Sequence, residues 1–130
     1  MYHSTNLHRA ERAAPDRAAV LTKAAVRAAA MLGLKGKELA RVLGLSEAAV
    51  SRMRKGNWLL REGSKEYELA ALVVRLFRSL DAMVGGDAEA MRAWMRAPNE
   101  ALEAVPAERI SQVEGLVDVL AYLDARRARL

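Results

Sequence analysis

The side chains best suited to chemistry in this chain are polar and basic groups between residues 46 and 55. Hydroxyl, carboxylate and guanidinium groups can hydrogen-bond to the edges of DNA bases, and cations can pair with phosphates. We expect base contacts from Glu47, Ala48, Ser51 and Arg52, at the start of this segment, and phosphate contacts from the flanking cations. The full set of candidate DNA-binding residues is Lys37, Ser46, Glu47, Ala48, Ser51, Arg52, Arg54 and Lys55.

A helix-turn-helix pattern positions these side chains. Ala40 lies where two helices approach closely, and Gly44 supplies the positive φ that ends the first helix. Ser46 is placed to cap the second helix by accepting a hydrogen bond from a backbone N–H. Val50 and Met53 give the second helix a buried stripe, so its polar residues face outward. That helix is then the one that enters the major groove. The alternative is an ordinary helical hairpin whose charges are merely solvated.

Residues suited to catalysis or metal binding are few. The only histidines are His3 and His8, both near the N-terminus, and the chain has no cysteine. Glu62, Glu66 and Glu68 fit the solvated start of a helix better than general acid–base chemistry. We find no serine–histidine–aspartate set, phosphate-binding glycine loop or metal motif in the sequence. We therefore expect no enzymatic activity, no cofactor and no metal site.

The composition of the 130 residues is that of a helical protein. Apolar residues make up 52% of the chain, much of it alanine, whereas aromatic residues make up only 5%. Such a chain has little of the β-branched and aromatic content from which sheets are built. No apolar run approaches the roughly 20 residues of a membrane span, and the first twelve residues lack the apolar core of a signal peptide. We expect an all-α, soluble, cytoplasmic protein.

Charge divides the chain into two unlike parts. Residues 1–61 hold 12 lysines and arginines against 4 acids, a net charge of +8, whereas residues 62–130 hold 9 against 12, a net charge of −3. The cations of the first part favour binding to a polyanion such as DNA, because each phosphate contact releases condensed counterions. The asymmetry indicates that the two parts meet different partners.

Helix and turn signals divide the chain into three regions. Residues 1–14 are polar and lack periodicity, which predicts a mobile arm. Residues 15–64 form the helix-turn-helix region, and residues 65–130 form a second helical region. Besides the two helices of the motif, we expect helices over about residues 15–32, 65–84, 87–95 and 111–127.

The sequence also predicts how an apolar loop and the last helix contact the core. An apolar triplet in the loop of residues 57–65 is expected to fold back onto the core rather than form an exposed hot spot; its members are Trp58, Leu59 and Leu60. Residues 111–114 match a capping box at the start of the last helix. On that helix one face is expected to be buried, through Val113, Leu116, Val117, Leu120 and Leu123.

The second half of the chain also carries motifs in a fixed order. They are Arg75-Leu76-Phe77-Arg78-Ser79-Leu80-Asp81, Gly85-Gly86-Asp87, Ala93-Trp94-Met95, Pro98-Asn99-Glu100-Ala101-Leu102, Pro106 before Ile110, Glu114-Gly115-Leu116-Val117 and Tyr122-Leu123-Asp124-Ala125-Arg126. With the helix-turn-helix, they resemble the antitoxin family called Xre/MbcA/ParS over about residues 15–130. One departure is Glu103-Ala104, where relatives tend to have small residues, often glycine.

The resemblance implies a partner and a mode of action. Members of this family join an Xre-like helix-turn-helix to a C-terminal toxin-binding domain and are encoded beside RES-domain toxins. The implied toxin degrades NAD⁺ by cleaving its nicotinamide–ribose bond. The antitoxin would neutralise the toxin by binding it directly, and would repress its own operon alone or together with the toxin.

Candidate toxin-binding residues lie at two places in the second region: Trp94, Pro98 and Asn99 at one, and Arg126, Arg127, Arg129 and Leu130 at the other. Trp94 has two interpretations, as a core anchor or as an interface residue, since indole is enriched in interface hot spots. Asn99 is either a cap or turn former or part of the same interface. The basic C-terminus is either simply solvated or a cationic plug for a pocket that binds an anionic dinucleotide.

The sequence therefore predicts an all-α antitoxin of six or seven helices, forming a homodimer through part of its C-terminal region and binding a RES-domain toxin and operator DNA. The main alternative is a one-component transcriptional regulator whose C-terminal region only dimerises or senses a ligand. A further alternative is a nucleoid-associated protein without a specific operator. A RES-domain toxin in the adjacent reading frame would favour the first of these.

Overall fold

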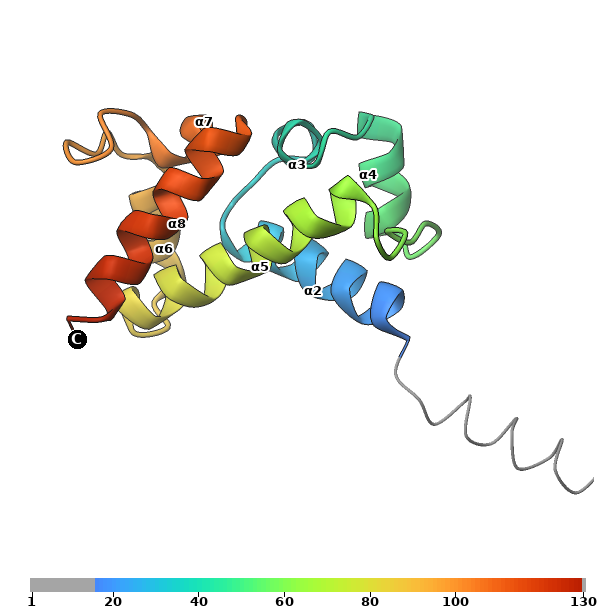
Figure 1. Cartoon of the computed structure of the whole chain (residues 1–130), viewed down its shortest axis with the longest axis horizontal. Coiled ribbons are helices and arrows are strands. Elements are labelled where there is room, and N and C mark those ends of the chain that lie inside the picture. The colour runs from blue at the N-terminus through green and yellow to red at the C-terminus, as the bar shows by residue number, and fades with distance from the viewer. Residues whose placement is uncertain (1–15, 130) are drawn as a thin grey trace, which may run out of the picture.

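A computed structural model describes residues 16–129 and is all-α over that range. The expected arm of residues 1–14, with both histidines, and Leu130 lie outside the described residues. No β-strand occurs between residues 16 and 129, where an isolated bridge pairs Asn99 with Ala104. The helices, labelled in Figure 1, are α2 (Arg17–Met31), α3 (Gly36–Leu43), α4 (Glu47–Arg54), α5 (Lys65–Val84), α6 (Ala88–Arg96), α7 (Pro106–Arg109) and α8 (Val113–Arg127).

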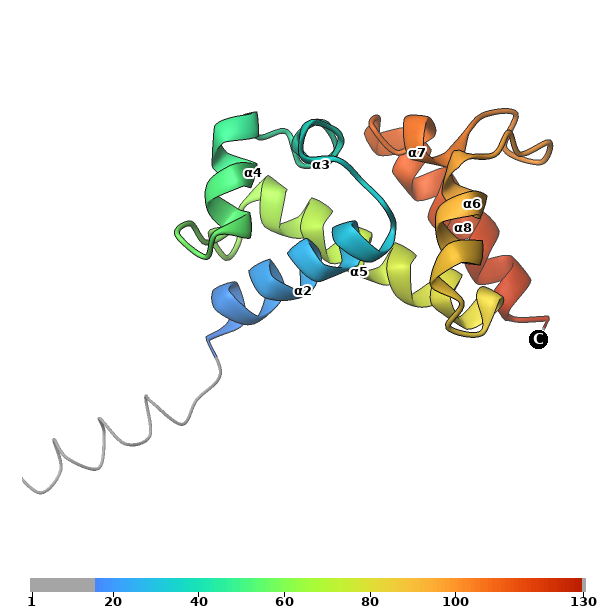
Figure 2. The ribbon, with the colours of Figure 1, turned by 180° about the vertical axis from the view of Figure 1, so that it is seen from behind.

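The long helix α5 connects the two halves of the molecule (Figures 1 and 2). Helices α2 and α3 pack against α5 on one side of the molecule, and α6 and α8 pack against it on the other. Leu76 and Leu80 of α5 are fully buried, and each such leucine stabilises the fold by about 1.5–3 kcal/mol. Asp124 of α8 accepts hydrogen bonds from Ser79 Oγ at 2.9 Å and from Arg75 Nη2 at 3.0 Å. The helix-turn-helix and the C-terminal helices therefore share one structural support.

The helix ends follow the local signals in most places. Asp16 caps α2, Ser46 caps α4 and Asp87 caps α6, each by accepting hydrogen bonds from backbone N–H groups of the first turn. Gly85 ends α5 in the left-handed conformation. The expected helices over residues 15–32, 65–84 and 87–95 are confirmed to within a residue or two at each described end.

The predicted capping box at residues 111–114 is wrong. Helix α8 starts at Val113 after Gln112, which makes no side-chain cap. The Ser111 hydroxyl donates instead to the Glu108 carbonyl at 2.8 Å, and the Ser111 backbone N–H donates to the same oxygen at 3.2 Å, so Ser111 belongs to the end of α7.

The predicted buried face of the last helix is also partly wrong. Val113 is 59% exposed and Val117 is 50% exposed. Gly115 takes a place on the buried side, which turns both valines toward solvent. The buried residues of α8 are Gly115, Leu116, Val119, Leu120 and Leu123.

The apolar loop triplet folds back in two of its three members. Leu60 is fully buried, and its backbone N–H donates to the Thr22 hydroxyl at 3.0 Å. Trp58 is half-buried against the core. Leu59, however, is 48% exposed. The prediction is therefore confirmed for Trp58 and Leu60 and wrong for Leu59.

Candidate DNA-binding face and toxin-binding domain

Helices α3 and α4 form the predicted helix-turn-helix. Gly44 ends α3 with φ of 70°, in the left-handed region where glycine carries no steric cost. The Leu45 N–H donates to the Ala40 carbonyl at 2.9 Å, and Ala40 is buried between the helices. Ser46 Oγ accepts from the Ala49 N–H at 3.0 Å, which caps α4. The turn is thus fixed by interactions that involve residues 40–49 alone.

The outer face of α4 presents the residues expected to meet DNA. Ala49, Val50 and Met53 are buried, whereas the predicted base-contacting residues and Lys55 are exposed. At 100° per residue, Ser51 and Lys55 lie opposite the buried stripe, with Arg52 at its flank. Among residues 16–129 no ion pair engages Lys37, Arg52 or Lys55, so these cations are available to DNA. The exposed set is Lys37, Ser46, Glu47, Ala48, Ser51, Arg52, Arg54 and Lys55.

Arg54 differs from the other predicted contacts because it also has a partner within the chain. Its Nη2 donates to the Leu34 carbonyl at 3.1 Å, in the loop between α2 and α3. A Cβ at position 36 would lie 3.2 Å from Arg54 Nη1, so the guanidinium rests close against Gly36. Arg54 therefore ties the end of α4 to the loop before α3. Its predicted phosphate contact remains a proposal.

A groove beside the C-terminal end of α4 adds two cations that sequence reasoning missed. The groove has a volume of about 370 Å³, and its wall on α2 includes Lys23 and Arg27. Arg54, Lys55 and Trp58 line the opposite side. Lys23 and Arg27 are four residues apart, so they lie on one face of α2. The spacing alone indicates that Lys23 and Arg27 share a face of α2. Only the packing of α2 beside α4 shows that this face adjoins the candidate DNA-binding residues.

Trp94 packs between the helices of the C-terminal half. Its ring stacks on Tyr122 of α8, with centroids 6.3 Å apart and planes at 22°. The guanidinium carbon of Arg126 lies 5.8 Å from the Tyr122 centroid, close enough for a cation–π contact. Trp94 is half-buried, so it anchors α6 to α8 and keeps part of its surface exposed.

Asn99 shapes the loop between α6 and α7. Its Oδ1 accepts from the Leu102 N–H at 3.1 Å, and its backbone pairs with Ala104 in both directions. Glu103 lies inside this turn with φ of 53°, a conformation that costs a non-glycine residue energy. Pro98 is exposed. The turn-forming interpretation of Asn99 is therefore confirmed, and Glu103 adopts the left-handed conformation that glycine favours.

The predicted toxin-binding residues do not form one cluster. The loop that contains Pro98 and Asn99 lies above α8 in Figure 1, and the C-terminal end lies below it. Trp94 and Arg126 are brought together through Tyr122, whereas Arg127 and Arg129 are exposed past the stack. The exposed valines of α8, Val113 and Val117, add an apolar surface to this domain that sequence reasoning had assigned to the core.

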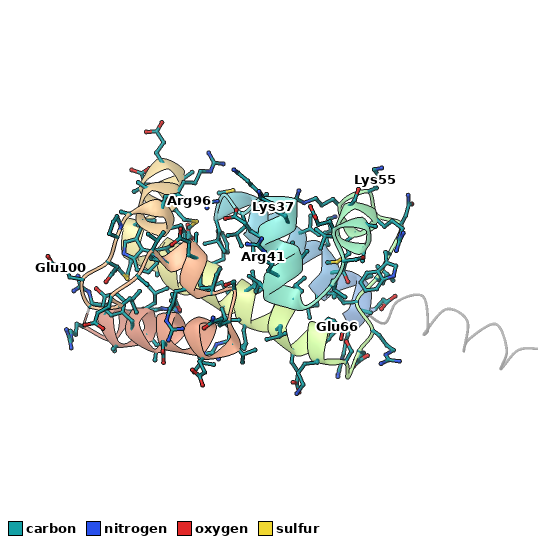
Figure 3. All side chains as sticks on the ribbon, turned by 90° about the horizontal axis from the view of Figure 1, so that it is seen from above. Lys37, Arg41, Lys55, Glu66, Arg96 and Glu100 are labelled. Carbon is teal, nitrogen blue, oxygen red and sulfur yellow. The ribbon has the colours of Figure 1, made fainter. Side chains whose placement is uncertain are left out.

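An ion pair connects the helix-turn-helix to the C-terminal half. Arg96, at the end of α6, donates from Nη1 and Nη2 to the two carboxylate oxygens of Glu38 in α3, at 2.6 and 2.7 Å. Figure 3 shows Arg96 between α6 and α3. The guanidinium hydrogen bonds lower the pKa of the Glu38 carboxyl to about 2, against the opposing effect of burial, and the Lys35 backbone N–H lowers it further. The same pairing raises the pKa of Arg96.

Acid is expected to remove the stabilisation that this ion pair provides. Because the folded-state pKa of Glu38 is lowered from 4.5 to about 2, its contribution is complete above pH 4.5 and is lost as the pH falls toward 2. The Arg96 side chain is 40% exposed, so we expect Glu38→Gln to cost only about 1–2 kcal/mol at pH 7. Urea unfolding of both proteins between pH 7 and 2.5 measures this difference. A difference that stays constant across that range would contradict the assignment.

Taken together, these elements define an all-α protein in which a helix-turn-helix is followed by a second helical domain. Family comparison makes this specific. Residues 11–75 match the antitoxin Xre-like helix-turn-helix domain, and residues 79–129 match the antitoxin Xre/MbcA/ParS C-terminal toxin-binding domain. The chain belongs to the Xre/MbcA/ParS antitoxin family, and its resemblance to that family is confirmed. The boundary between the two matches falls within α5.

A search of curated proteins gives no significant match to this chain. Between residues 16 and 129 no group of three or more histidine, cysteine or acidic side chains could hold a metal ion. Over the same part of the chain, each helix is too short or too polar to cross a membrane.

Proposed function

We propose that this chain is the antitoxin of a type II toxin–antitoxin system. In this proposal it inhibits a RES-domain toxin that degrades NAD⁺ and represses its own operon through α3 and α4. The observation that carries the proposal is that one chain joins an antitoxin-type helix-turn-helix to a toxin-binding domain. The unequal charge of the two halves, +8 and −3, is consistent with two different partners.

The DNA-binding part of the proposal rests on the outer face of α4. Glu47, Ala48, Ser51 and Arg52 are exposed on the first turns of a capped helix, where recognition helices read base edges. Lys37 and Lys55, which are exposed and flank them, would contact phosphates. Lys23 and Arg27, in the adjoining groove, extend the cationic surface onto α2. A homodimer would present two such faces to half-sites about one helical turn apart.

The toxin-binding part of the proposal has two candidate surfaces. The first is the C-terminal tail, in which Arg127 and Arg129 are exposed. A pocket for NAD⁺ must stabilise a pyrophosphate and accept flat rings, so a cationic segment could block the pocket or its entrance. The second is the body of the domain, where Val113 and Val117 form an exposed apolar pair and Trp94 keeps part of its surface free. Tryptophan is enriched among the residues that dominate interface energy, so Trp94 is the candidate anchor of this surface.

Truncation separates the two surfaces. Arg126 contacts Tyr122, so the cut is best made after it, by deleting residues 127–130. We expect the truncated protein to keep its helical content and operator binding but to neutralise the toxin less well. The measurement is cellular NAD⁺ after co-expression with the toxin encoded in the adjacent reading frame, where the truncated form should restore NAD⁺ loss.

The matched variant for the body of the domain is Val117→Asp, which adds a charge to the exposed apolar pair without touching the tail. Full protection by the truncated form together with failure of Val117→Asp would assign inhibition to the domain body. If neither change alters NAD⁺, and the full-length protein forms no complex with that toxin, a one-component transcriptional regulator becomes the better assignment.

A further inference from the structure

We propose that Arg96, in the toxin-binding domain, is a positioning residue for DNA binding by the helix-turn-helix, so that toxin and operator binding are energetically coupled. The inference rests on the proposed function, because it concerns the operator affinity of the same α3–α4 unit. Its basis is a set of hydrogen bonds that hold the loop before α3 from two sides.

Arg96 holds the start of α3 through three hydrogen bonds. Besides the two bonds to Glu38, its Nη2 donates to the Gly33 carbonyl at 2.6 Å. Glu38 is the third residue of α3, and its Oε1 also accepts from the Lys35 N–H at 2.8 Å. One carboxylate therefore caps the first helix of the motif and binds a side chain of α6, which lies 58 residues further along the chain.

A second arginine holds the same loop from the opposite side. Arg54, at the end of α4, donates to the Leu34 carbonyl, the residue next to the one that Arg96 holds. The stem of Arg92 also rests on this loop, since a Cβ at Gly33 would lie 3.2 Å from Arg92 Cγ. The loop between α2 and α3 is thus clamped between α4 and α6. A shift of α6 would therefore move the N-terminal end of α3 relative to α4.

Helix α6 also carries part of the proposed toxin-binding surface. Arg92 and Arg96 are four residues apart and face the loop, whereas Trp94 faces α8 and stacks on Tyr122. A partner that binds across α6 and α8 therefore acts on the helix that holds the clamp. The ion pair is accessible enough to be exchanged, because its side chains are 40% and 18% exposed for Arg96 and Glu38. Coupling between two sites requires only that each ligand favours one arrangement of such a shared element.

Glu38→Gln gives a test whose sign distinguishes positioning from simple charge. Removing an acid near DNA should strengthen binding by Coulomb attraction alone. Glutamine at the third helical position still caps the backbone, so α3 keeps its start. If Arg96 positions the motif through Glu38, Glu38→Gln should instead weaken binding to duplex DNA from upstream of the gene by about five- to twentyfold. Equal or tighter binding would overturn the proposal.

Variants of Arg96 and a matched control complete the experiment. Arg96→Gln should weaken binding as Glu38→Gln does, the double variant should be no weaker than either, and Arg96→Lys should recover only part, since one ammonium cannot make all three bonds. Arg75→Gln removes an exposed ion pair between α5 and α8, with the same change of net charge, and should leave affinity within about twofold. A loss in Arg75→Gln equal to that in Arg96→Gln would indicate a charge effect and overturn the inference.

Coupling to the toxin is read from the same DNA titrations. Saturating toxin should change the operator affinity of the wild-type protein, and this change should shrink toward none in Arg96→Gln. An identical ratio in both proteins would contradict the coupling. Circular dichroism melts confirm that each variant is folded at the assay temperature. If the wild-type protein itself does not bind the DNA, the proposed function fails, whereas wild-type binding with unaffected variants rejects only the role of Arg96.

Discussion

Gly115→Ala is expected to destabilise the protein by about 3 kcal/mol, the upper end of what overpacking a core usually costs. Gly115 is buried where α8 crosses the end of α7. A Cβ at this position would overlap the Arg109 carbonyl oxygen and lie 2.7 Å from its carbonyl carbon. Because these are backbone atoms, relief requires α7 and α8 to move apart, which opens the core around Leu116 and Ile110. Urea unfolding followed by circular dichroism measures the loss.

The expected sign is opposite to that of helix propensity. In an exposed helix interior, alanine is more favourable than glycine by about 1 kcal/mol, so propensity alone predicts that Gly115→Ala stabilises α8. Ala121→Gly, at an exposed position of the same helix, is the matched control and should cost about 1 kcal/mol. An unchanged or raised midpoint for Gly115→Ala would show that the two helices are not in close contact at this point.

The second large effect is expected at the outer face of α4. Arg52→Ala should lose about 1–3 kcal/mol of operator affinity and relax the preference for the base it contacts, because bidentate arginine contacts discriminate between bases. Lys55→Ala should weaken binding to all sequences alike and lower the dependence of affinity on salt. Gel-shift titrations on operator and scrambled duplexes, at several salt concentrations, distinguish the two behaviours.

The control for net charge is Arg78→Ala, which removes an exposed cation of α5 outside the helix-turn-helix. It should leave the ratio of operator to scrambled affinity unchanged. If Arg52→Ala weakens both duplexes equally, Arg52 contacts phosphate and the base-reading face lies elsewhere on α4.

The sequence by itself determined the local features of this protein. The turn at Gly44, the cap at Ser46 and the outward face of α4 were all predicted, and the structure agrees with each. These features depend on residues three to five positions apart, whose geometry is set by the helix and by the conformational freedom of glycine. The all-α class follows in the same way from composition and period. The family resemblance of the C-terminal motifs is likewise contained in the sequence alone.

Only the tertiary structure decided which surfaces the helices bury and which side chains meet across the chain. Val113 and Val117 have the spacing of a buried stripe, yet Gly115 is the residue that lets α8 approach α7, and so the valines face solvent. The sequence predicts only a phosphate contact for Arg54, whereas the fold also gives its guanidinium a partner in the Leu34 carbonyl. Glu38 and Arg96 lie 58 residues apart, and no local pattern relates them. Their pairing depends on how α3 and α6 pack against α5, because the distance between side chains on separate helices is set by the core and not by the sequence around either residue.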